Sequence, residues 1–343
     1  MKTFTNLFAK ITSFENLLLA AHKAAQGKRE RPYVLLFFER LEDNLWRLQE
    51  ELEAQTYRPG QYSTSRIYAP KPRLISAAPF RDRVVHHALI NVIGPLFERS
   101  FIFDSYANRV GKGTHRAIRR YQHFLRLYEY VLKLDFKKYF PSIDHEILKA
   151  LLRRRIGDLK ALWLIDAIID GSNEQESPMD YFAGDDLFTP ITRQRGLPIG
   201  NLTSQFFANV YLDPLDHFIK EQLHCRAYLR YVDDSALFSQ RKAELHAWRE
   251  QVSVFTAEHH RIKLHHKHCY IYPARVGRHF LGQKVFRTHR LLAAVNVRSF
   301  KTRLRGWQES APENLEQRLA SWQGHAEQAD TFRLRAALGL RSH

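Results

Sequence analysis

Cysteine is scarce in this sequence, where Cys225 and Cys269 are the only two among 343 residues. Two cysteines exclude the dense disulfide framework of a small secreted protein and fit a reducing compartment. The cluster His265-His266-Lys267-His268-Cys269 invites a zinc site, but it lacks the paired spacing of zinc ligands. Adjacent residues on a strand also point to opposite faces, so we interpret these histidines as part of a basic surface.

Long apolar runs are missing as well. No run approaches the length of a membrane span, and residues 1–6 do not open a signal peptide. We therefore expect no contact with a membrane and a cytoplasmic location. The sequence shows no internal repeat, and 343 residues suffice for a large core with two or three subdomains.

Negative charge is in short supply. The chain has 53 Lys and Arg against 36 Asp and Glu, a formal net charge of +17, and 13% of its residues are aromatic. The positive excess is spread along the chain instead of forming a tail. Cationic side chains for phosphates and aromatic faces for bases or sugars suit a folded protein that holds a nucleic acid, although charge alone does not establish it.

Three of the aspartates stand in two short apolar segments rich in residues that favour β-strands. Asp135 ends the segment that begins at Val131, and Asp233 and Asp234 lie within residues 227–238. A carboxylate buried without a cationic partner takes up a proton instead of staying charged. Two strands that deliver three carboxylates therefore predict an oxygen-rich site for Mg²⁺, and a pair of such ions suits nucleotidyl transfer. The alternative is that these aspartates are ordinary turn residues or helix caps.

The sequence before Asp135 predicts helices and one hairpin. Apolar residues keep helical spacing over the first 60 residues, up to Pro59-Gly60, and residues 84–99 form another amphipathic segment. Between them, residues 61–80 alternate apolar and polar side chains, which predicts a β-hairpin. Thr114 is a candidate N-cap for the helix that follows it.

The sequence after Asp135 predicts a mixed pattern. A helix is expected to start at Asp144-His145-Glu146, and two helices run through Ile169. Residues 171–195 predict a polar loop or hairpin, and residues 291–343 are basic and helical in pattern.

Six blocks of sequence stand in a fixed order between about residue 30 and residue 285. They are Lys71-Pro72-Arg73-Leu74-Ile75 with Arg81-Asp82-Arg83, the segments 109–115 and 132–145, Tyr231-Val232-Asp233-Asp234, Leu264 with Lys267, and Phe280-Leu281-Gly282-Gln283. Together they resemble the motifs of reverse transcriptases, in the order in which that family carries them. One tetrapeptide would be weak evidence, whereas six blocks in order are specific.

The resemblance implies an α+β fold of the right-hand polymerase type, with fingers, a palm built on an antiparallel sheet, and a short helical thumb. We expect N-terminal helices and fingers, with part of the palm, in residues 1–130, and the palm in residues 131–290 with a fingers insertion near residues 146–195. Residues 291–343 are expected to form the thumb. The implied activity is RNA-templated DNA synthesis by a bacterial, archaeal or phage-encoded enzyme.

The resemblance also implies roles for individual residues. Asp135, Asp233 and Asp234 are expected to be catalytic and, with the backbone carbonyl of Phe136, to hold two Mg²⁺ ions, which Mn²⁺ can replace. The residues expected to bind the deoxynucleoside triphosphate are Lys71, Arg73, Phe136, Phe140, Ile199, Gly200 and Lys267. The residues expected to contact template or primer are Arg81, Arg109, Gly111, Lys112, Gly113, Ser204, Gln205, Tyr231, Leu281 and Gly282.

Two of these expectations have an alternative beside them. Phe140 falls where the family places an aromatic ring against the sugar 2′ position, but it can also be an ordinary core phenylalanine. Asp185-Asp186 resembles the acidic turn of viral RNA polymerases. It precedes residues 196–205, whereas such polymerases place the acidic turn after that segment. We therefore predict a solvated loop at Asp185-Asp186.

Residues 196–205 depart from the pattern of mobile-intron and retroviral enzymes, which have Gln-Gly and Ser-Pro at the positions of Ile199-Gly200 and Ser204-Gln205. The departure resembles the reverse transcriptases of diversity-generating retroelements, which copy a template-repeat RNA with errors opposite adenines. That resemblance implies template RNA, a primer with its growing cDNA, dNTPs and a basic accessory variability protein as partners.

Two alternatives remain beside the retroelement reading. One is a group II-like or phage-defence reverse transcriptase of ordinary fidelity, and the other is a non-catalytic RNA-binding or maturase-like protein. The three aspartates, the basic fingers residues and Phe140 argue against the second, because binding alone requires none of the acids.

Overall fold

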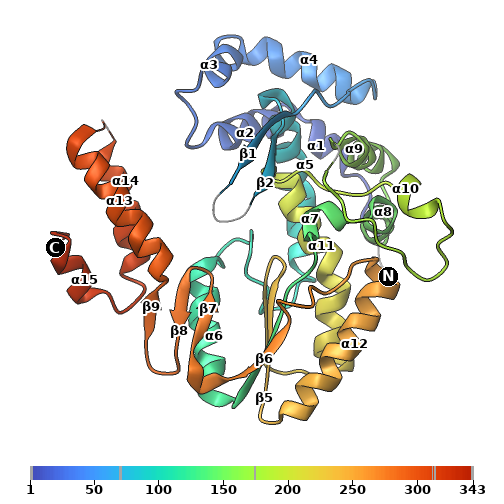
Figure 1. Ribbon diagram of the computed structural model, residues 1–343. Helices are drawn as coiled ribbons and strands as arrows, with labels where there is room; N and C mark the ends of the chain where they lie inside the picture. The colour runs from blue at the N-terminus through green and yellow to red at the C-terminus, as the bar shows by residue number, and fades with distance from the viewer. Residues whose placement is uncertain (1–2, 69–71, 174, 311, 313, 341–343) are drawn as a thin grey trace.

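A four-stranded antiparallel sheet forms the lower part of the molecule in Figure 1, with the strand order β4-β5-β3-β6. Its strands are β3 (Tyr130–Leu134), β4 (Tyr228–Tyr231), β5 (Asp234–Ser239) and β6 (Tyr270–Pro273). The computed structural model describes residues 3–68, 72–173, 175–310, 312 and 314–340. β3 confirms the predicted strand before Asp135, whereas residues 227–238, predicted as a single strand, form the hairpin β4–β5 with Asp233 in its turn.

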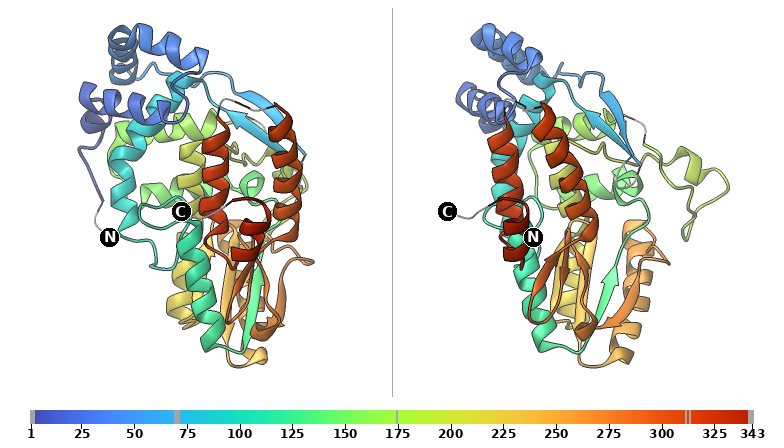
Figure 2. Two further views of the ribbon diagram at one scale, coloured as in Figure 1. Left: turned by 90° about the vertical axis from the view of Figure 1, so that its left-hand side faces the viewer. Right: turned by 60° about the vertical axis from the view of Figure 1, so that its left-hand side comes forward.

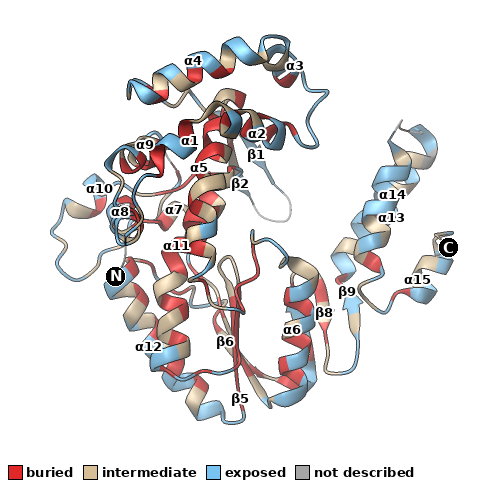
Figure 3. Cartoon of the chain, turned by 180° about the vertical axis from the view of Figure 1, so that it is seen from behind, coloured by how far each residue is buried: buried red, intermediate tan, exposed pale blue. Residues whose placement is uncertain are grey.

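Successive residues of β3 face opposite sides of the sheet, as the geometry of a strand requires. Leu132 and Leu134 belong to the larger hydrophobic cluster, which includes residues of the helices α11 and α12. Val131 belongs to the second cluster, with residues of α6. Figure 3 shows the buried faces of these helices turned toward the sheet. The helices are α6 (Thr114–Leu127), α11 (Leu202–His217) and α12 (Lys242–His260), with a π-helical turn at Phe218–Gln222 after α11.

The N-terminal part is helical except for one two-stranded hairpin, as predicted. The helices end at Glu53, six residues before Pro59-Gly60, and they break at Arg40, where the backbone leaves the helical region (φ −125°, ψ 49°). The elements are α1 (Phe8–Thr12), α2 (Phe14–Ala25), α3 (Pro32–Glu39), α4 (Leu41–Glu53), β1 (Ser63–Ile67), β2 (Arg73–Ala77) and α5 (Phe80–Glu98). The hairpin register, from Ser63 opposite Ala77 to Ile67 opposite Arg73, carries Arg73 at the start of β2.

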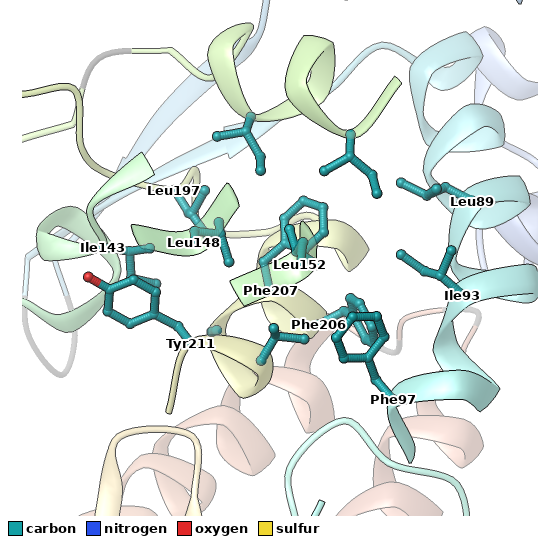
Figure 4. Packing of buried hydrophobic residues seen from close by; sticks show 14 of the residues in the cluster. Leu89, Ile93, Phe97, Ile143, Leu148, Leu152, Leu197, Phe206, Phe207 and Tyr211 are labelled. Carbon is teal, nitrogen blue, oxygen red and sulfur yellow. The ribbon is translucent and has the colours of Figure 1, made fainter. Parts of the chain in front are cut away.

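In the described part of the chain, four helices lie between β3 and α11 in the sequence. The side chain of Asp144 accepts hydrogen bonds from the N–H groups of Glu146 and Ile147, which confirms the predicted helix start. No hairpin forms within the described residues of 171–195, which are loops around one short helix. The helices are α7 (Tyr139–Ser142), α8 (His145–Arg153), α9 (Leu159–Asp170) and α10 (Thr189–Thr192). Figure 4 shows residues of α8 packed together with residues of α5 and α11 in one core.

The C-terminal part consists of a small sheet and three helices. Figures 1 and 2 show α13 and α14 as an arm beyond the small sheet. The ring of Phe300 stacks on that of Trp322 at 3.8 Å, so α13 and α14 pack on each other. The elements are η2 (Ala274–Val276), β7 (Arg278–Phe280), β8 (Gln283–Val285), β9 (Arg290–Leu292), α13 (Ala294–Ser310), α14 (Leu315–Ala326) and α15 (Phe332–Ala337). The helices thus begin at Ala294, because residues 290–292 pair as a strand.

The α+β fold class is therefore confirmed, with antiparallel pairing in all three sheets of the described residues. Among those same residues, no helix combines the length and the apolar character that crossing a bilayer requires.

His260, at the end of α12, is buried without a hydrogen-bond partner for either ring nitrogen among the described residues. Its ring lies 5.4 Å from that of Tyr211 and 5.5 Å from that of Phe255. Burial, followed by the charge of the neighbouring His259, lowers the pKa of His260 from 6.5 to about 3. The folded protein therefore holds this imidazole neutral where the unfolded chain would protonate it.

This pKa difference predicts a loss of stability in acid. The contribution of His260 is fully present above pH 6.5 and is lost as the pH falls toward 3, because the unfolded chain takes up a proton that the folded one does not. In His260→Leu, the drop in unfolding free energy between pH 7 and pH 4 should shrink by roughly 2–3 kcal/mol. Urea unfolding at several pH values measures it, with the exposed His246→Leu on the same helix as the control. Parallel pH profiles for wild type and His260→Leu would contradict the prediction.

Candidate active site

The register of the central sheet brings the three predicted aspartates to one end of it. Leu134 lies opposite Ser235, so Asp135, which follows β3, is next to the start of β5 at Asp234. Asp233 lies in the two-residue turn that joins β4 to β5. Asp135 thus meets the adjacent Asp233 and Asp234, which lie about 100 residues later in the sequence, at one edge of the sheet.

All three aspartates line one cavity of 470 Å³ between the sheet, the hairpin β1–β2 and α7. A larger cavity of 930 Å³ lies between α3 and the start of α5 and contains none of them. The residues that line the 470 Å³ cavity are Pro72, Arg73, Leu74, Lys133, Asp135, Phe136, Lys138, Tyr139, Phe140, Pro141, Gln175, Glu176, Ile199, Asp233, Asp234 and His265.

The carboxylates crowd one another electrostatically. Burial, together with the charges of Asp234 and Asp135, raises the pKa of Asp233 to about 6, while Arg73 acts in the opposite direction. The ammonium of Lys133 lies 3.0 Å from a carboxylate oxygen of Asp234. A divalent cation at this place would relieve the repulsion that raises the pKa of Asp233.

The donor chemistry of this cavity fits Mg²⁺. No group of three or more His, Cys, Asp or Glu side chains in the described part of the chain is arranged to hold a metal ion by itself. Mg²⁺ does not need such a cage, since it keeps several water ligands and binds through one or two carboxylates and the phosphates of a substrate. Asp135 and Asp233, both in the cavity wall, would supply the carboxylates.

The backbone holds Asp135 firmly. Its carbonyl oxygen accepts a hydrogen bond from the N–H of His265 at 2.8 Å, and the thiol of Cys269 lies 3.3 Å from both its N and its O. The next residue, Phe136, pairs with Leu264 in an antiparallel bridge. The two hydrogen bonds that flank this pair are made by the neighbouring residues, from the N–H of Lys137 to the carbonyl of Lys263 and from the N–H of His265 to that of Asp135. In such a pair the carbonyl points away from the partner strand. The carbonyl of Phe136 therefore faces the side of the sheet edge where Asp233 lies.

A buried arginine supports the turn that carries Asp233. Arg230 and Asp216 have no exposed side-chain surface and form an ion pair with N–O distances of 2.6 to 3.0 Å. The Tyr228 hydroxyl also donates to Asp216, at 2.7 Å. Arg230 donates further to the backbone carbonyl of Val232 at 3.0 Å, and Val232 has a φ of 56°. A β-branched residue rarely adopts that conformation, so this hydrogen bond helps to hold a strained turn.

The predicted nucleotide-binding residues are found in different places. Arg73, Phe136, Phe140 and Ile199 line the cavity. Lys267 does not, because it lies exposed in the turn 266–268. His265 lines the cavity instead. Lys71 lies outside the described residues.

Gly200 adjoins the cavity through Ile199. Its φ is +120°, and an added Cβ would come within 3.3 Å of the Ile75 side chain and 3.4 Å of the Ser76 carbonyl. The N–H of Ser76 donates to the carbonyl of Ile199 at 2.9 Å. Glycine is therefore required where this loop passes close to β2.

The segment Gly111–Gly113 leads into α6, which contacts the hairpin that carries Asp233 and Asp234. Gly113, with a φ of 94°, is the N-cap of α6, and Gly111 has a φ of 71°. The expectation that Thr114 caps this helix is wrong by one residue, because Thr114 is already helical. Its hydroxyl instead lies 3.0 Å from that of Tyr231 at the end of β4. This contact ties the start of α6 to the hairpin of the aspartates.

Three predicted nucleic-acid contacts are engaged within the protein. The Arg109 side chain is only 6% exposed, pairs with Glu98 at 2.7 Å and donates to the carbonyls of Ile102 and Ser105. The Lys112 ammonium lies 3.5 Å from the centre of the Phe103 ring and donates to the carbonyl of the same residue. Both cations thus have partners within the protein, and their contact with nucleic acid stays a prediction.

Arg81 is also paired, with Glu51, and its guanidinium lies 5.2 Å from the centre of the Tyr57 ring. It lines the 930 Å³ cavity and not that of the aspartates. A direct contact with nucleic acid would therefore have to displace Glu51.

The remaining predicted contacts lie at helix and strand ends. Ser204 is buried in the first turn of α11, and Gln205 lines a small cavity of 170 Å³. Leu281 and Gly282 form the two-residue turn between β7 and β8, with φ values of 47° and 84°. The carbonyl of Gly282 accepts hydrogen bonds from the backbone of Ala293 and the side chain of Asn296, which joins this turn to the start of α13.

The sequence reasoning missed several residues that build the site. Asn201 connects α11 to the end of β2, since its side chain accepts from the N–H of Ala78 at 3.2 Å and donates to the carbonyl of Ser76 at 2.9 Å. The sequence contains a signal for Arg230, since a charged residue inside an apolar strand is expected to have a buried partner. Lys133 was detectable because it precedes Asp135 by two residues and so shares its face of the strand.

The expectation of a solvated loop at Asp185-Asp186 holds only for the second residue. Asp186 is exposed and accepts hydrogen bonds from Thr189 at the start of α10. The Asp185 side chain is largely buried against Arg193, with which it forms an ion pair. Asp185 is absent from the wall of the 470 Å³ cavity, as the order of the motifs predicted.

Comparison with known proteins identifies relatives of this chain. The family model described as "Reverse transcriptase (RNA-dependent DNA polymerase)" matches residues 64–285. Protein YkfC of Escherichia coli (strain K12) is 27% identical over 194 residues, which are 53% of this chain and 47% of that protein. Group II intron-encoded protein LtrA of Lactococcus lactis subsp. cremoris is 24% identical over 183 residues, which are 52% of this chain and 28% of that protein. The matched region thus spans less than half of each of these two relatives.

A solved structure shares the fold. Apo telomerase from Candida tropicalis, truncated from the C-terminal domain, superposes with a TM-score of 0.50 over 71% of this chain and 58% of that one. The sequences are 14% identical, so this likeness concerns the fold alone. It confirms the expected right-hand polymerase architecture.

The buried Arg230–Asp216 pair generates a prediction about stability. Arg230→Met should lower the unfolding free energy by roughly 3–5 kcal/mol, because it leaves the Asp216 carboxylate buried without its charged partner. Arg230→Met combined with Asp216→Leu should regain most of that loss, since no buried charge is left. Denaturant unfolding measures both variants. A double variant less stable than Arg230→Met would show that the loss has another origin.

Proposed function

Because the chain belongs to the reverse transcriptase family, we propose that it polymerises DNA on an RNA template in the cavity lined by Asp135, Asp233 and Asp234. The observation that carries the proposal is the meeting of these three carboxylates with Arg73 in one cavity of 470 Å³. Acids that are costly to bury and a cation from the facing hairpin suit a site for a metal-bound triphosphate.

Each wall of the cavity has a role in this proposal. Bound Mg²⁺ or Mn²⁺ would lower the pKa of the primer 3′-hydroxyl and offset charge at the α-phosphate. Asp135 and Asp233 would hold these ions together with the carbonyl of Phe136, and Asp234 would support one of them. Arg73, exposed at the start of β2, would contact the triphosphate through charge-assisted hydrogen bonds. The ring of Phe140, in the cavity wall, would lie against the sugar and leave no room for a 2′-hydroxyl.

We further propose that the enzyme is error-prone and serves a diversity-generating retroelement, copying a template RNA into mutated cDNA with the help of a basic accessory protein. Support comes from Ile199, which lines the cavity where the mobile-intron and retroviral pattern has glutamine. An isoleucine cannot form the hydrogen bonds that a glutamine can offer to a templating nucleotide or its neighbours. The second candidate is a group II-like or phage-defence reverse transcriptase of ordinary fidelity, and the similarity to the group II intron-encoded protein LtrA favours its group II-like form.

Primer extension tests the polymerase proposal. Wild-type protein with an annealed RNA template, DNA primer, dNTPs and Mg²⁺ should extend the primer, and Asp233→Asn should reduce the rate at least a thousandfold, because a carboxylate that holds the ions is lost. The exposed Asp43→Asn on α4 is the control and should extend normally. RNA binding measured by filter retention should be similar in all three. Activity retained in Asp233→Asn would remove that residue from the mechanism, and inactive wild type that binds RNA would favour the non-catalytic alternative.

Sequencing the extension products tests fidelity. Wild type should misincorporate mainly opposite template adenines, and Ile199→Gln should lower the error frequency by up to about tenfold while the extension rate changes less, because each restored hydrogen bond is worth roughly 0.5–1.5 kcal/mol. Ile191→Gln, at an exposed position of α10, is the matched control. Accurate cDNA from wild type would support the ordinary-fidelity candidate. An unchanged error spectrum in Ile199→Gln would separate that residue from fidelity.

A further inference from the structure

Lys133 is a cation built into the wall of the cavity. Among the described residues it makes the only ion pair with any of the three aspartates, at 3.0 Å from Asp234. Its side chain is 23% exposed and that of Asp234 is 35% exposed, so the pair is only partly screened by solvent. The motifs that identified the family gave this lysine no role.

The backbone places the Lys133 side chain on the same face of the sheet as Asp135 and Asp234. Strand alternation puts Lys133 and Asp135 on the same face of the sheet, away from α11 and α12. Lys133 lies directly opposite Ala236 on β5, and Asp234 is two residues before Ala236 on that same face. The small side chain of Ala236 leaves space for the lysine stem to cross diagonally to Asp234. On its other side Lys133 is opposite the larger Tyr270 of β6.

This pair changes the charge that the cavity offers to a cation. Three carboxylates carry up to three negative charges, and Lys133 offsets one of them at a distance typical of a strong ion pair. A divalent ion that approaches Asp234 must displace the ammonium or share the carboxylate with it.

An incoming triphosphate would alter this balance. It brings several negative charges into the cavity, to which an ammonium on a flexible four-carbon stem can turn. Asp234 would then be free for a metal ion at the moment when the nucleotide and its own ion arrive. The other lysine in the wall, Lys138, cannot do the same, since its ammonium donates to the backbone carbonyl of Glu176 at 2.9 Å and pairs with no aspartate of the site.

We propose that Lys133 is a positioning residue that acts as the resident counter-ion of Asp234 in the nucleotide-free protein and so makes loading of divalent ions depend on the nucleotide. The proposal rests on the proposed polymerase function and adds a regulation of its metal site. Replacement of Lys133 by a neutral residue should let divalent ions bind before the nucleotide does.

The test is the affinity of nucleotide-free protein for Mn²⁺, followed by electron paramagnetic resonance of the free ion. Lys133→Met should bind Mn²⁺ on the order of tenfold more tightly than wild type, because one positive charge beside the carboxylates is gone while the stem is kept. The control Lys138→Met should stay within about twofold of wild type, since its ammonium faces a carbonyl. Circular dichroism and thermal unfolding check that both variants are folded. If Lys133→Met does not fold, Lys133→Gln replaces it.

A second arm adds a non-hydrolysable dNTP analogue. The difference between wild type and Lys133→Met should then shrink to less than about threefold, because the phosphates attract the ammonium of wild type away from Asp234. Equal or weaker Mn²⁺ binding by nucleotide-free Lys133→Met would overturn the proposal, as would a difference that persists unchanged with the analogue.

The failure of this proposal is distinguishable from failure of the polymerase function. Asp233→Asn should weaken Mn²⁺ binding in every arm, because it removes a carboxylate of the site itself. If wild type binds Mn²⁺ with the analogue but Lys133→Met shows no gain without it, only the role of Lys133 is wrong. If wild type binds no Mn²⁺ with the analogue either, and Asp233→Asn changes nothing, the metal site falls and the proposed function with it.

Discussion

The buried ion pair between Arg230 and Asp216 is the constraint on which the geometry of the active site depends. It joins α11 to β4, and the same guanidinium holds the carbonyl of Val232 in a conformation that a β-branched residue avoids. That conformation closes a two-residue turn and presents Asp233 at the sheet edge beside Asp135. Buried charges are expensive, but here each one has its partner, so the cost is offset while the turn is fixed.

Much of the fold could be predicted from the sequence because its signals are local. The apolar run before Asp135 predicted β3, and the alternation of apolar and polar residues in 61–80 predicted the hairpin β1–β2. The side chain of Asp144 caps α8 as expected, since capping depends on a few adjacent residues. Residues 171–195 were ambiguous for the opposite reason, as a polar segment without periodicity contains no signal that separates loop from hairpin.

The acidic residues of the candidate site could be predicted from the sequence, whereas the positions of its arginines and lysines could be predicted less well. A carboxylate inside an apolar segment is rare, so its place in the sequence is enough to identify it as a candidate functional residue. An arginine in a basic chain, in contrast, has many possible partners. Arg109 illustrates this, because its guanidinium contacts Glu98 and two carbonyls that only the folded loop brings together. Lys267 likewise follows a family motif, yet the backbone turns it into solvent and places His265 in the cavity wall.

Charge balance connects these observations. A chain of net charge +17 concentrates three carboxylates in one cavity, and the pKa of Asp233 rises because burial and its two neighbours outweigh the opposing influence of Arg73. Such a cavity attracts positive charge. The register of β3 with β5 places one cation there, the ammonium of Lys133 beside Asp234. The same alternation of β3 that buries Leu132 and Leu134 therefore exposes Lys133 and Asp135 together. One face of this strand thus packs in the larger core, while the other brings Lys133 and Asp135 to the cavity.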